Sequence, residues 1–274
     1  MFRPDQSGTL SVSGASLHWE STGAGPALLL IHAGIADHSM WDDDVPVLAV
    51  GHRVVTYDCR GYGRSASTDV AFSNRADIAA LMDHLGLERV AVVGISRGGM
   101  IALDFAIEQP ARVSALVLVA AGIGGMQIDS RPDEQALFAL EEPMWQAGDW
   151  AGIADLDVRI WVDGIGQPTD RVPAAIRERV RAMSRANYES RHPEGKPVVL
   201  APPAAGRLGE ITAPTLIIHG DLDESAAGPI ADALEHGIGR ARQVTLAGVA
   251  HMANLERPAE FQSLVLDFLA EAGA

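Results

Sequence analysis

Short apolar runs alternate with segments of helical periodicity along this chain. The runs are rich in Val, Ile and Leu, and each ends at Gly or at polar residues; they occupy 27–33, 53–59, 89–95, 112–120, 214–220 and 242–248. Short continuous apolar runs are typical of strands that are buried on both faces of a parallel sheet. Ahead of them, residues 9–13 and 16–21 alternate in polarity around Gly14, which predicts an antiparallel hairpin at the sheet edge.

Helical patterns fill the intervals between the runs. Ser73 or Asn74 can cap a helix that stops at Gly86, and Pro258 can open a terminal helix. A regular alternation of strands and helices favours parallel pairing with helices on both faces. The sequence therefore predicts an α/β fold, with a mostly parallel central sheet flanked by helices.

One long segment, 122–207, breaks the alternation. It contains no convincing strand, but it has helix-like stretches and three of the five tryptophans, Trp145, Trp150 and Trp161. Loops this long without structure are uncommon in compact domains, and such insertions often form lids over a site. We expect a helical cap at 122–207, inserted into a core formed by residues 1–121 and 208–274.

Charge and composition narrow the possible partners. The 274 residues are 47% hydrophobic and 21% charged, and the net charge of -15 would repel nucleic acids and anionic lipid heads. The longest apolar stretches, 27–36 and 115–126, are too short to cross a bilayer. With a single cysteine, Cys59, and a start that does not resemble a signal peptide, we expect a cytoplasmic protein that acts on a small molecule. The sequence leaves the oligomeric state open.

The strongest chemical signal is the pentapeptide 94–98, which fits G-x-S-x-G between an apolar run and a helix-like segment. A sharp turn from strand to helix leaves no room for side chains at its flanking positions, and this explains Gly94 and Gly98. The same turn lifts the serine hydroxyl above the sheet. Ser96 is therefore the candidate nucleophile.

A serine hydroxyl needs a base within hydrogen-bond reach, and the base needs an orienting acid. His251 lies in a loop after the last apolar run, as the order serine, acid, histidine requires. The acid should follow the run that ends at Gly220, where both Asp221 and Asp223 are available. We favour Asp223, because Asp221 is better placed to shape the turn.

The same site needs donors for a developing oxyanion. The backbone N–H of Arg97 follows the nucleophile, and Gly34 is our choice for the second donor, with its neighbour Ala33 as the alternative. Ala33, Trp145 and Trp161 are candidates for substrate contact. We expect neither a metal nor an organic cofactor, because the sequence has no cluster with metal-ligand spacing and no phosphate-binding glycine loop.

Together these motifs resemble the α/β-hydrolase superfamily, and in particular its small capped members of the 3-oxoadipate enol-lactonase type. The resemblance covers the whole chain and rests on residues 32–34 with Trp41, on 57–65, and on 94–98, 220–223 and 248–256. It implies an α/β-hydrolase fold and hydrolysis of an ester or lactone. Two residues depart from the usual pattern: Ala33 replaces a glycine, and Arg97 replaces a smaller or uncharged residue.

The expected reaction is attack of Ser96 on a carbonyl, followed by hydrolysis of the acyl-enzyme. The alternatives are carbon–carbon bond hydrolysis or cofactor-free perhydrolysis on the same triad, and a ligand-binding protein that keeps the fold without turnover. The Arg97 side chain suggests a further hypothesis. It could bind a substrate carboxylate, or it could instead pair with a nearby acid such as Glu224 or Asp37.

Overall fold

The computed structural model describes residues 3–190 and 195–274. Most of its strands form one sheet in the order β1-β2-β4-β3-β7-β8-β10-β11, with the short β5 beside β2. The strand bounds are β1 Gln6–Val12, β2 Ala15–Thr22, β3 Ala27–Ile31, β4 Arg53–Tyr57, β5 Ala66–Ser67, β7 Val90–Ile95, β8 Val113–Val119, β10 Thr215–Gly220 and β11 Ala241–Leu246.

The predicted parallel sheet is confirmed. Strands β4, β3, β7, β8, β10 and β11 pair in parallel, whereas β1 and β2 form the expected antiparallel hairpin around Gly14 at the edge. Every residue of β7 and of β10 is buried, as central strands with two covered faces require. Strands β3 and β4 end two residues before the apolar runs that predicted them, because the chain turns there into loops above the sheet.

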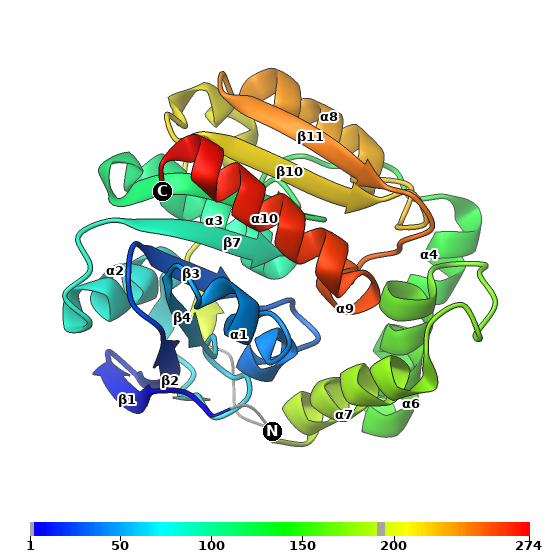
Figure 1. Ribbon diagram of the computed structural model, residues 1–274. Helices are drawn as coiled ribbons and strands as arrows, with labels where there is room; N and C mark the ends of the chain where they lie inside the picture. The colour runs from blue at the N-terminus through cyan, green and yellow to red at the C-terminus, as the bar shows by residue number, and fades with distance from the viewer. Residues whose placement is uncertain (1–2, 191–194) are drawn as a thin grey trace.

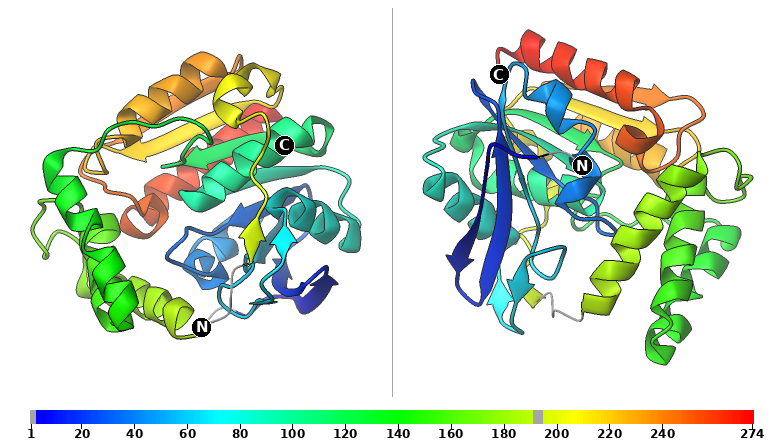
Figure 2. Two further views of the ribbon diagram at one scale, coloured as in Figure 1. Left: turned by 180° about the vertical axis from the view of Figure 1, so that it is seen from behind. Right: turned by 60° about the horizontal axis from the view of Figure 1, so that its bottom comes forward.

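Helices cover both faces of the sheet (Figures 1 and 2). The apolar cluster on one face contains residues of α2 (Asn74–His84), α3 (Arg97–Glu108) and α8 (Ala227–Gly237). The cluster on the other face contains residues of α1 (Val45–Leu48) and α10 (Pro258–Ala272). Along β3, Leu29 belongs to the first cluster and Leu28 to the second, because successive side chains of a strand point to opposite faces.

The long segment between β8 and β10 is mostly helical. It holds α4 (Pro132–Phe138), α5 (Glu141–Ala147), α6 (Trp150–Asp157), a π-helical turn (Val158–Asp163) and α7 (Ala174–Ser190). Figure 1 shows α4, α6 and α7 together at one end of the sheet. We refer to these helices as the cap.

The same segment also contains a short strand that the sequence pattern does not predict. Residues Lys196–Pro197 form β9, which pairs with β6 (Ala71–Phe72) in a separate two-stranded sheet. A pairing of two residues has no hydrophobic period, and this explains why the pattern misses it.

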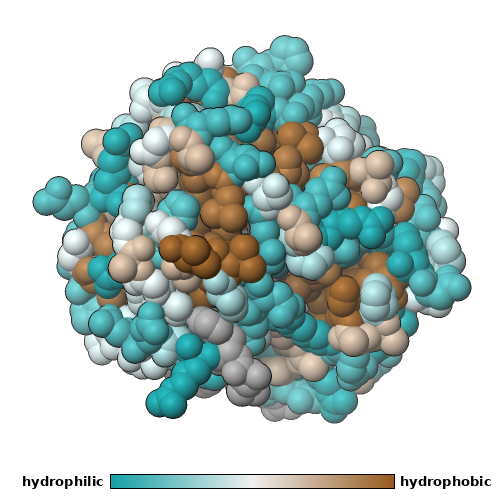
Figure 3. Space-filling model, viewed as in Figure 1, coloured by the Kyte–Doolittle hydropathy of each residue, from teal (hydrophilic) through white to brown (hydrophobic). Residues whose placement is uncertain are grey.

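The surface seen in Figure 3 mixes hydrophilic and hydrophobic residues, with the hydrophobic ones gathered in patches that hydrophilic side chains interrupt. Within the described residues, no helix is both long enough and apolar enough to span a membrane.

Candidate active site

Ser96 occupies the turn between β7 and α3 in a conformation that few residues adopt. Its φ is 56° and its ψ is -119°, so the backbone is strained at Ser96. The flanking glycines are required by space: a Cβ on Gly94 would lie 2.3 Å from the Gly98 carbonyl oxygen, and a Cβ on Gly98 would lie 2.4 Å from the Ile31 carbonyl oxygen. This crowding holds the turn tight and places Ser96 at the wall of a cavity of about 730 Å³.

His251 and Asp223 meet at the same end of the sheet. The Nδ1 atom of His251 lies 2.9 Å from each carboxylate oxygen of Asp223, and both side chains are almost fully buried. A proton on Nδ1 that is donated to Asp223 leaves Nε2 free to accept a proton. Asp221, the alternative acid, is engaged elsewhere, because its Oδ1 accepts from the Gly248 N–H at 2.7 Å.

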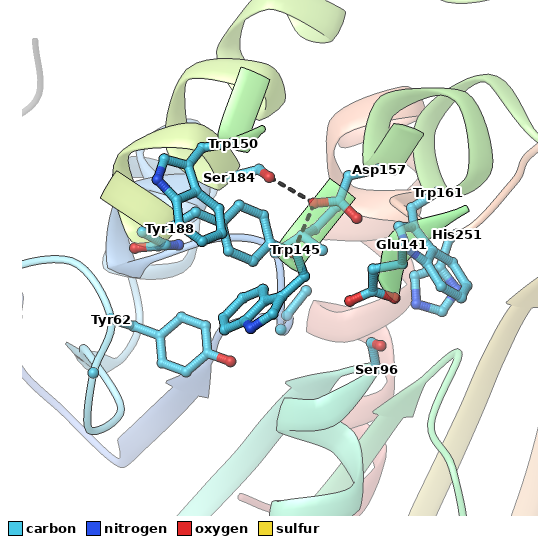
Figure 4. A pocket seen from close by; sticks show the side chains of 15 residues that line it. Tyr62, Ser96, Glu141, Trp145, Trp150, Asp157, Trp161, Ser184, Tyr188 and His251 are labelled. Atoms are coloured by element: carbon cyan, nitrogen blue, oxygen red, sulfur yellow. Dashed lines mark hydrogen bonds between the residues drawn. The ribbon is translucent and has the colours of Figure 1, made fainter. Parts of the chain in front are cut away.

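Ser96 and His251 face the same cavity, where Figure 4 shows the serine hydroxyl on the sheet side and the imidazole beside it. Within the described residues, no hydrogen bond joins them. Such contacts are often loose in a free enzyme and tighten when substrate binds.

The surroundings of His251 increase its affinity for a proton. Burial by itself would lower its pKa, but the charge and hydrogen bond of Asp223, with weaker contributions from Glu224 and Glu256, raise the pKa above the ordinary value. A base with a raised pKa accepts a proton readily, which is the property that activation of a serine needs.

The loop after β3 brings Gly34 to the cavity, opposite the start of α3. A Cβ on Gly34 would lie 3.4 Å from Arg97 Cδ, so this loop adjoins the turn between β7 and α3. His32, whose role the motif analysis did not foresee, holds the loop. Its Nδ1 lies 2.8 Å from the Ala33 carbonyl oxygen, and its Nε2 accepts from the Cys59 N–H at 3.0 Å.

Arg97 is not among the described residues that line the large cavity, so the lining gives no support to the idea that its side chain binds a substrate carboxylate there. Its guanidinium lies 4.8 Å from the centre of the Tyr62 ring. The same side chain lines a separate cavity of about 120 Å³, together with Asp104. A guanidinium at this distance over an aromatic face makes a cation–π contact, which is favourable for Arg97 in its present position.

The cap supplies the opposite wall of the large cavity. All three of the tryptophans noted above line it, and so does Ala33. Trp161 lies nearest the reacting groups, with its ring centre 4.6 Å from that of His251. Sequence reasoning missed several other lining side chains. Tyr62 lies within the motif 57–65, which carried no substrate role. The others come from separate cap helices that no motif marks: Glu141, Asp157, Ser184, Asn187 and Tyr188.

A second buried polar group lies where β2, the end of β4 and the turn His38–Trp41 meet. The nitrogen and oxygen atoms of His18, His38 and Asp58 lie within 4.8 Å of one another, which is close enough to bind a metal ion. However, the Arg64 guanidinium lies 3.2 Å from His18 Nε2 and from a Glu20 carboxylate oxygen. Since this side chain already brings a positive charge to the group, the described residues favour an ion-pair network over a cation site.

The fold and these motifs define a class of protein. The family model described as the alpha/beta hydrolase fold matches residues 26–258. This chain belongs to that family, and it is an α/β-fold hydrolase, as the resemblance implied.

Individual known proteins are similar over nearly the whole chain. The 2-hydroxy-6-oxo-6-phenylhexa-2,4-dienoate hydrolase of Comamonas testosteroni is 28% identical, over 92% of this chain and 91% of its own. The 2-hydroxy-6-oxononadienedioate/2-hydroxy-6-oxononatrienedioate hydrolase of Cupriavidus pinatubonensis is 29% identical, over 92% and 90%. Among solved structures, the enol-lactonase from Burkholderia xenovorans LB400 has a TM-score of 0.78 at 24% identity, covering 96% of this chain and all of that one. The similarity to the enol-lactonase structure shows a shared fold only.

Proposed function

We propose that this chain is a serine hydrolase that cleaves an ester or lactone through an acyl-enzyme. The observation that carries the proposal is the arrangement of Ser96, His251 and Asp223: a strained serine at a cavity wall, and a buried imidazole on the same cavity, bound to a carboxylate. Such an arrangement activates a hydroxyl for attack on a carbonyl.

In this mechanism, Ser96 Oγ attacks the carbonyl carbon while His251 Nε2 takes the serine proton. Asp223 holds the imidazole and stabilises its positive charge. The backbone N–H groups of Gly34 and Arg97 donate to the oxyanion. His251 then returns the proton to the leaving alcohol, and it activates a water molecule that hydrolyses the acyl-enzyme and regenerates the serine.

Hydrolysis of a carbon–carbon bond is the second candidate, because relatives at 28% and 29% identity are named for dienoate and dienedioate substrates. Dienoate and dienedioate substrates carry one or two carboxylates, so they are anions. The described residues that line this cavity include Glu141 and Asp157 but neither Lys nor Arg. A neutral ester or lactone therefore suits the lining better than a carboxylate does, since like charges repel in a partly dry site.

Product analysis tests the proposal. Purified protein should hydrolyse some members of a panel of 4-nitrophenyl esters and lactones, and Ser96→Ala should abolish that turnover while the circular dichroism spectrum stays unchanged. A phosphonate that reacts with serine esterases should label Ser96. Turnover of dienoic diketones with no ester hydrolysis would favour the second candidate. Failure of the phosphonate to label the protein would favour a binding protein without turnover.

A further inference from the structure

The wall of the cavity that faces Ser96 is both acidic and aromatic. In Figure 4, Trp145, Trp150, Tyr188, Asp157 and Glu141 surround the space on the cap side. They come from three helices, α5, α6 and α7, so only the folded cap brings them together. This wall lies beyond the groups assigned to bond cleavage, and its chemistry concerns the part of the substrate that does not react.

Asp157 is the most informative residue in this wall, because a buried carboxylate is costly unless a partner compensates it. Its exposed fraction is 7%. The Oδ2 atom accepts from the Ser184 hydroxyl at 2.6 Å and from the Tyr188 hydroxyl at 3.1 Å. Within the described residues Oδ1 accepts no hydrogen bond, and Figure 4 shows it turned away from the two hydroxyl groups.

No described Lys or Arg side chain forms an ion pair with Asp157. Burial raises its pKa to about 6 in spite of the two hydrogen bonds, so the group is mainly ionised at neutral pH. Glu141, the other carboxylate of the lining, adds negative charge on the same side. A carboxylate with two donors and one unused oxygen in a cavity is suited to receive a positive group from outside the chain.

The aromatic rings next to these carboxylates suit the same kind of ligand. The ring centres of Trp145 and Trp150 are 5.2 Å apart, and that of Tyr188 lies 5.9 Å from the first and 6.2 Å from the second. The three rings pack against one another, and all line the cavity. Faces of Trp and Tyr attract ammonium groups through their quadrupoles, most strongly where water is excluded.

We propose that, in the ester hydrolase proposed above, the cap wall binds a cationic amine or quaternary ammonium group on the non-reacting arm of the substrate. The carboxylates of Asp157 and Glu141 supply the opposite charge, and the three aromatic rings supply the apolar and quadrupolar contacts. The net charge of -15 acts in the same direction at long range, because it raises the local concentration of cations and repels anions.

Binding to the Ser96→Ala variant tests this inference separately from the reaction. Calorimetry with hexyltrimethylammonium and with heptanoate compares two ligands of similar length and opposite charge. We expect the ammonium compound to bind at least about tenfold more tightly, a difference of about 1.4 kcal/mol. Adding Asp157→Asn or Glu141→Gln should reduce that ratio. The matched controls Asp155→Asn and Glu142→Gln remove exposed charges on the same helices that do not line the cavity, and they should leave the ratio unchanged.

Turnover of charged and neutral esters tests whether the cap wall also contributes to the reaction at Ser96. The substrates are three 4-nitrophenyl esters whose acyl chains have equal length and end in a trimethylammonium, tert-butyl or carboxylate group. We expect kcat/KM to be highest for the trimethylammonium ester and lowest for the carboxylate ester. Heptanoate binding as tightly as hexyltrimethylammonium, or more tightly, would overturn the inference. An equal loss of affinity for both ligands in Asp157→Asn would also overturn it, because that is the result expected of a carboxylate with a structural role alone. Selective ammonium binding without hydrolysis of any ester would support the cation site and count against the proposed ester chemistry.

Discussion

At the scale of single residues, the roles of two neighbouring aspartates differ because of what each contacts. Asp223 binds the His251 ring, whereas Asp221 fixes the turn at Gly248. We expect Asp223→Asn to lower kcat by about 10⁴-fold, because the amide would favour the wrong imidazole tautomer. Asp221→Asn should keep activity within a few-fold. The measurement is steady-state kinetics on one ester; a larger loss in the Asp221 variant would reverse the assignment of the acid.

The residues that carry a motif could be predicted from the sequence, and those of the cap wall could not. Ser96 is marked by two flanking glycines, because the tight turn at this serine has no room for side chains on either side. The order of the catalytic residues along the chain then restricts where its base and acid can lie. Asp157 has no such mark. Its place depends on how α6 packs against α7, and a single sequence contains no pattern that specifies this packing. The same limit holds for the Arg97 side chain, because no sequence pattern predicts its contact with the Tyr62 ring.

At the scale of elements, the cap should determine which acyl groups fit. Trp145 on α5 is half exposed, and it lines the cavity. Replacing Trp145 by Ala should shift the preferred acyl chain to longer members of an ester series. The accompanying fall in Tm should be modest, because half of the side chain is exposed and its ring contacts are with Trp150 and Tyr188 rather than with the sheet core. Leu140→Ala is the matched control, since this exposed neighbour does not line the cavity. An unchanged ranking of esters in the Trp145 variant would argue against a substrate-contacting cap.

The segment that follows the Gly34 loop is anchored by an ionised histidine. His38 donates to Asp58 at 2.8 Å and lies 3.4 Å from a Glu20 oxygen. Burial by itself would lower the pKa of His38, but Asp58 and Glu20, with a smaller contribution from Asp37, raise it to about 10. Other ionisable groups near it include Asp42, His18 and Arg64.

The folded protein therefore keeps a proton on His38 that the unfolded chain loses above about pH 6.5. This contribution to stability is fully present below that pH and disappears as the pH rises toward about 10. The free energy of unfolding, measured by urea titration at several pH values, should fall across this window. His38→Gln should lower stability at pH 6 and flatten the decline, and an undiminished slope in the variant would show that other groups cause it.

At the scale of the whole molecule, the alternation of strands and helices fixes the sheet and the edge at which the site forms. Loops after β3, β7, β10 and β11 all leave the same edge, because parallel strands share their carboxyl end. Residues as distant in sequence as Gly34 and His251 thus reach one cavity. The pairing of β6 with β9 has no comparable signal, since it depends on a contact of only two residues.

The negative net charge should make the protein favour cationic substrates over anionic ones. With -15 formal charges, kcat/KM for an ammonium-bearing ester should fall as NaCl rises from about 0.02 to 0.5 M, because salt screens the attraction. The matched tert-butyl ester should show a flat salt dependence, and the carboxylate ester should improve. Identical salt responses of the three esters would exclude electrostatic steering by the protein.

The central claim is that Ser96 forms an acyl-enzyme, and a rapid-quench mass measurement tests it most directly. The protein is mixed with an ester that is hydrolysed slowly, quenched in acid within the first turnover, digested and sequenced by mass spectrometry. The mechanism predicts an added acyl mass on Ser96 that decays at the rate of turnover and is absent from Ser96→Ala. Full turnover without any acyl adduct, or with the adduct on another residue, would contradict the mechanism.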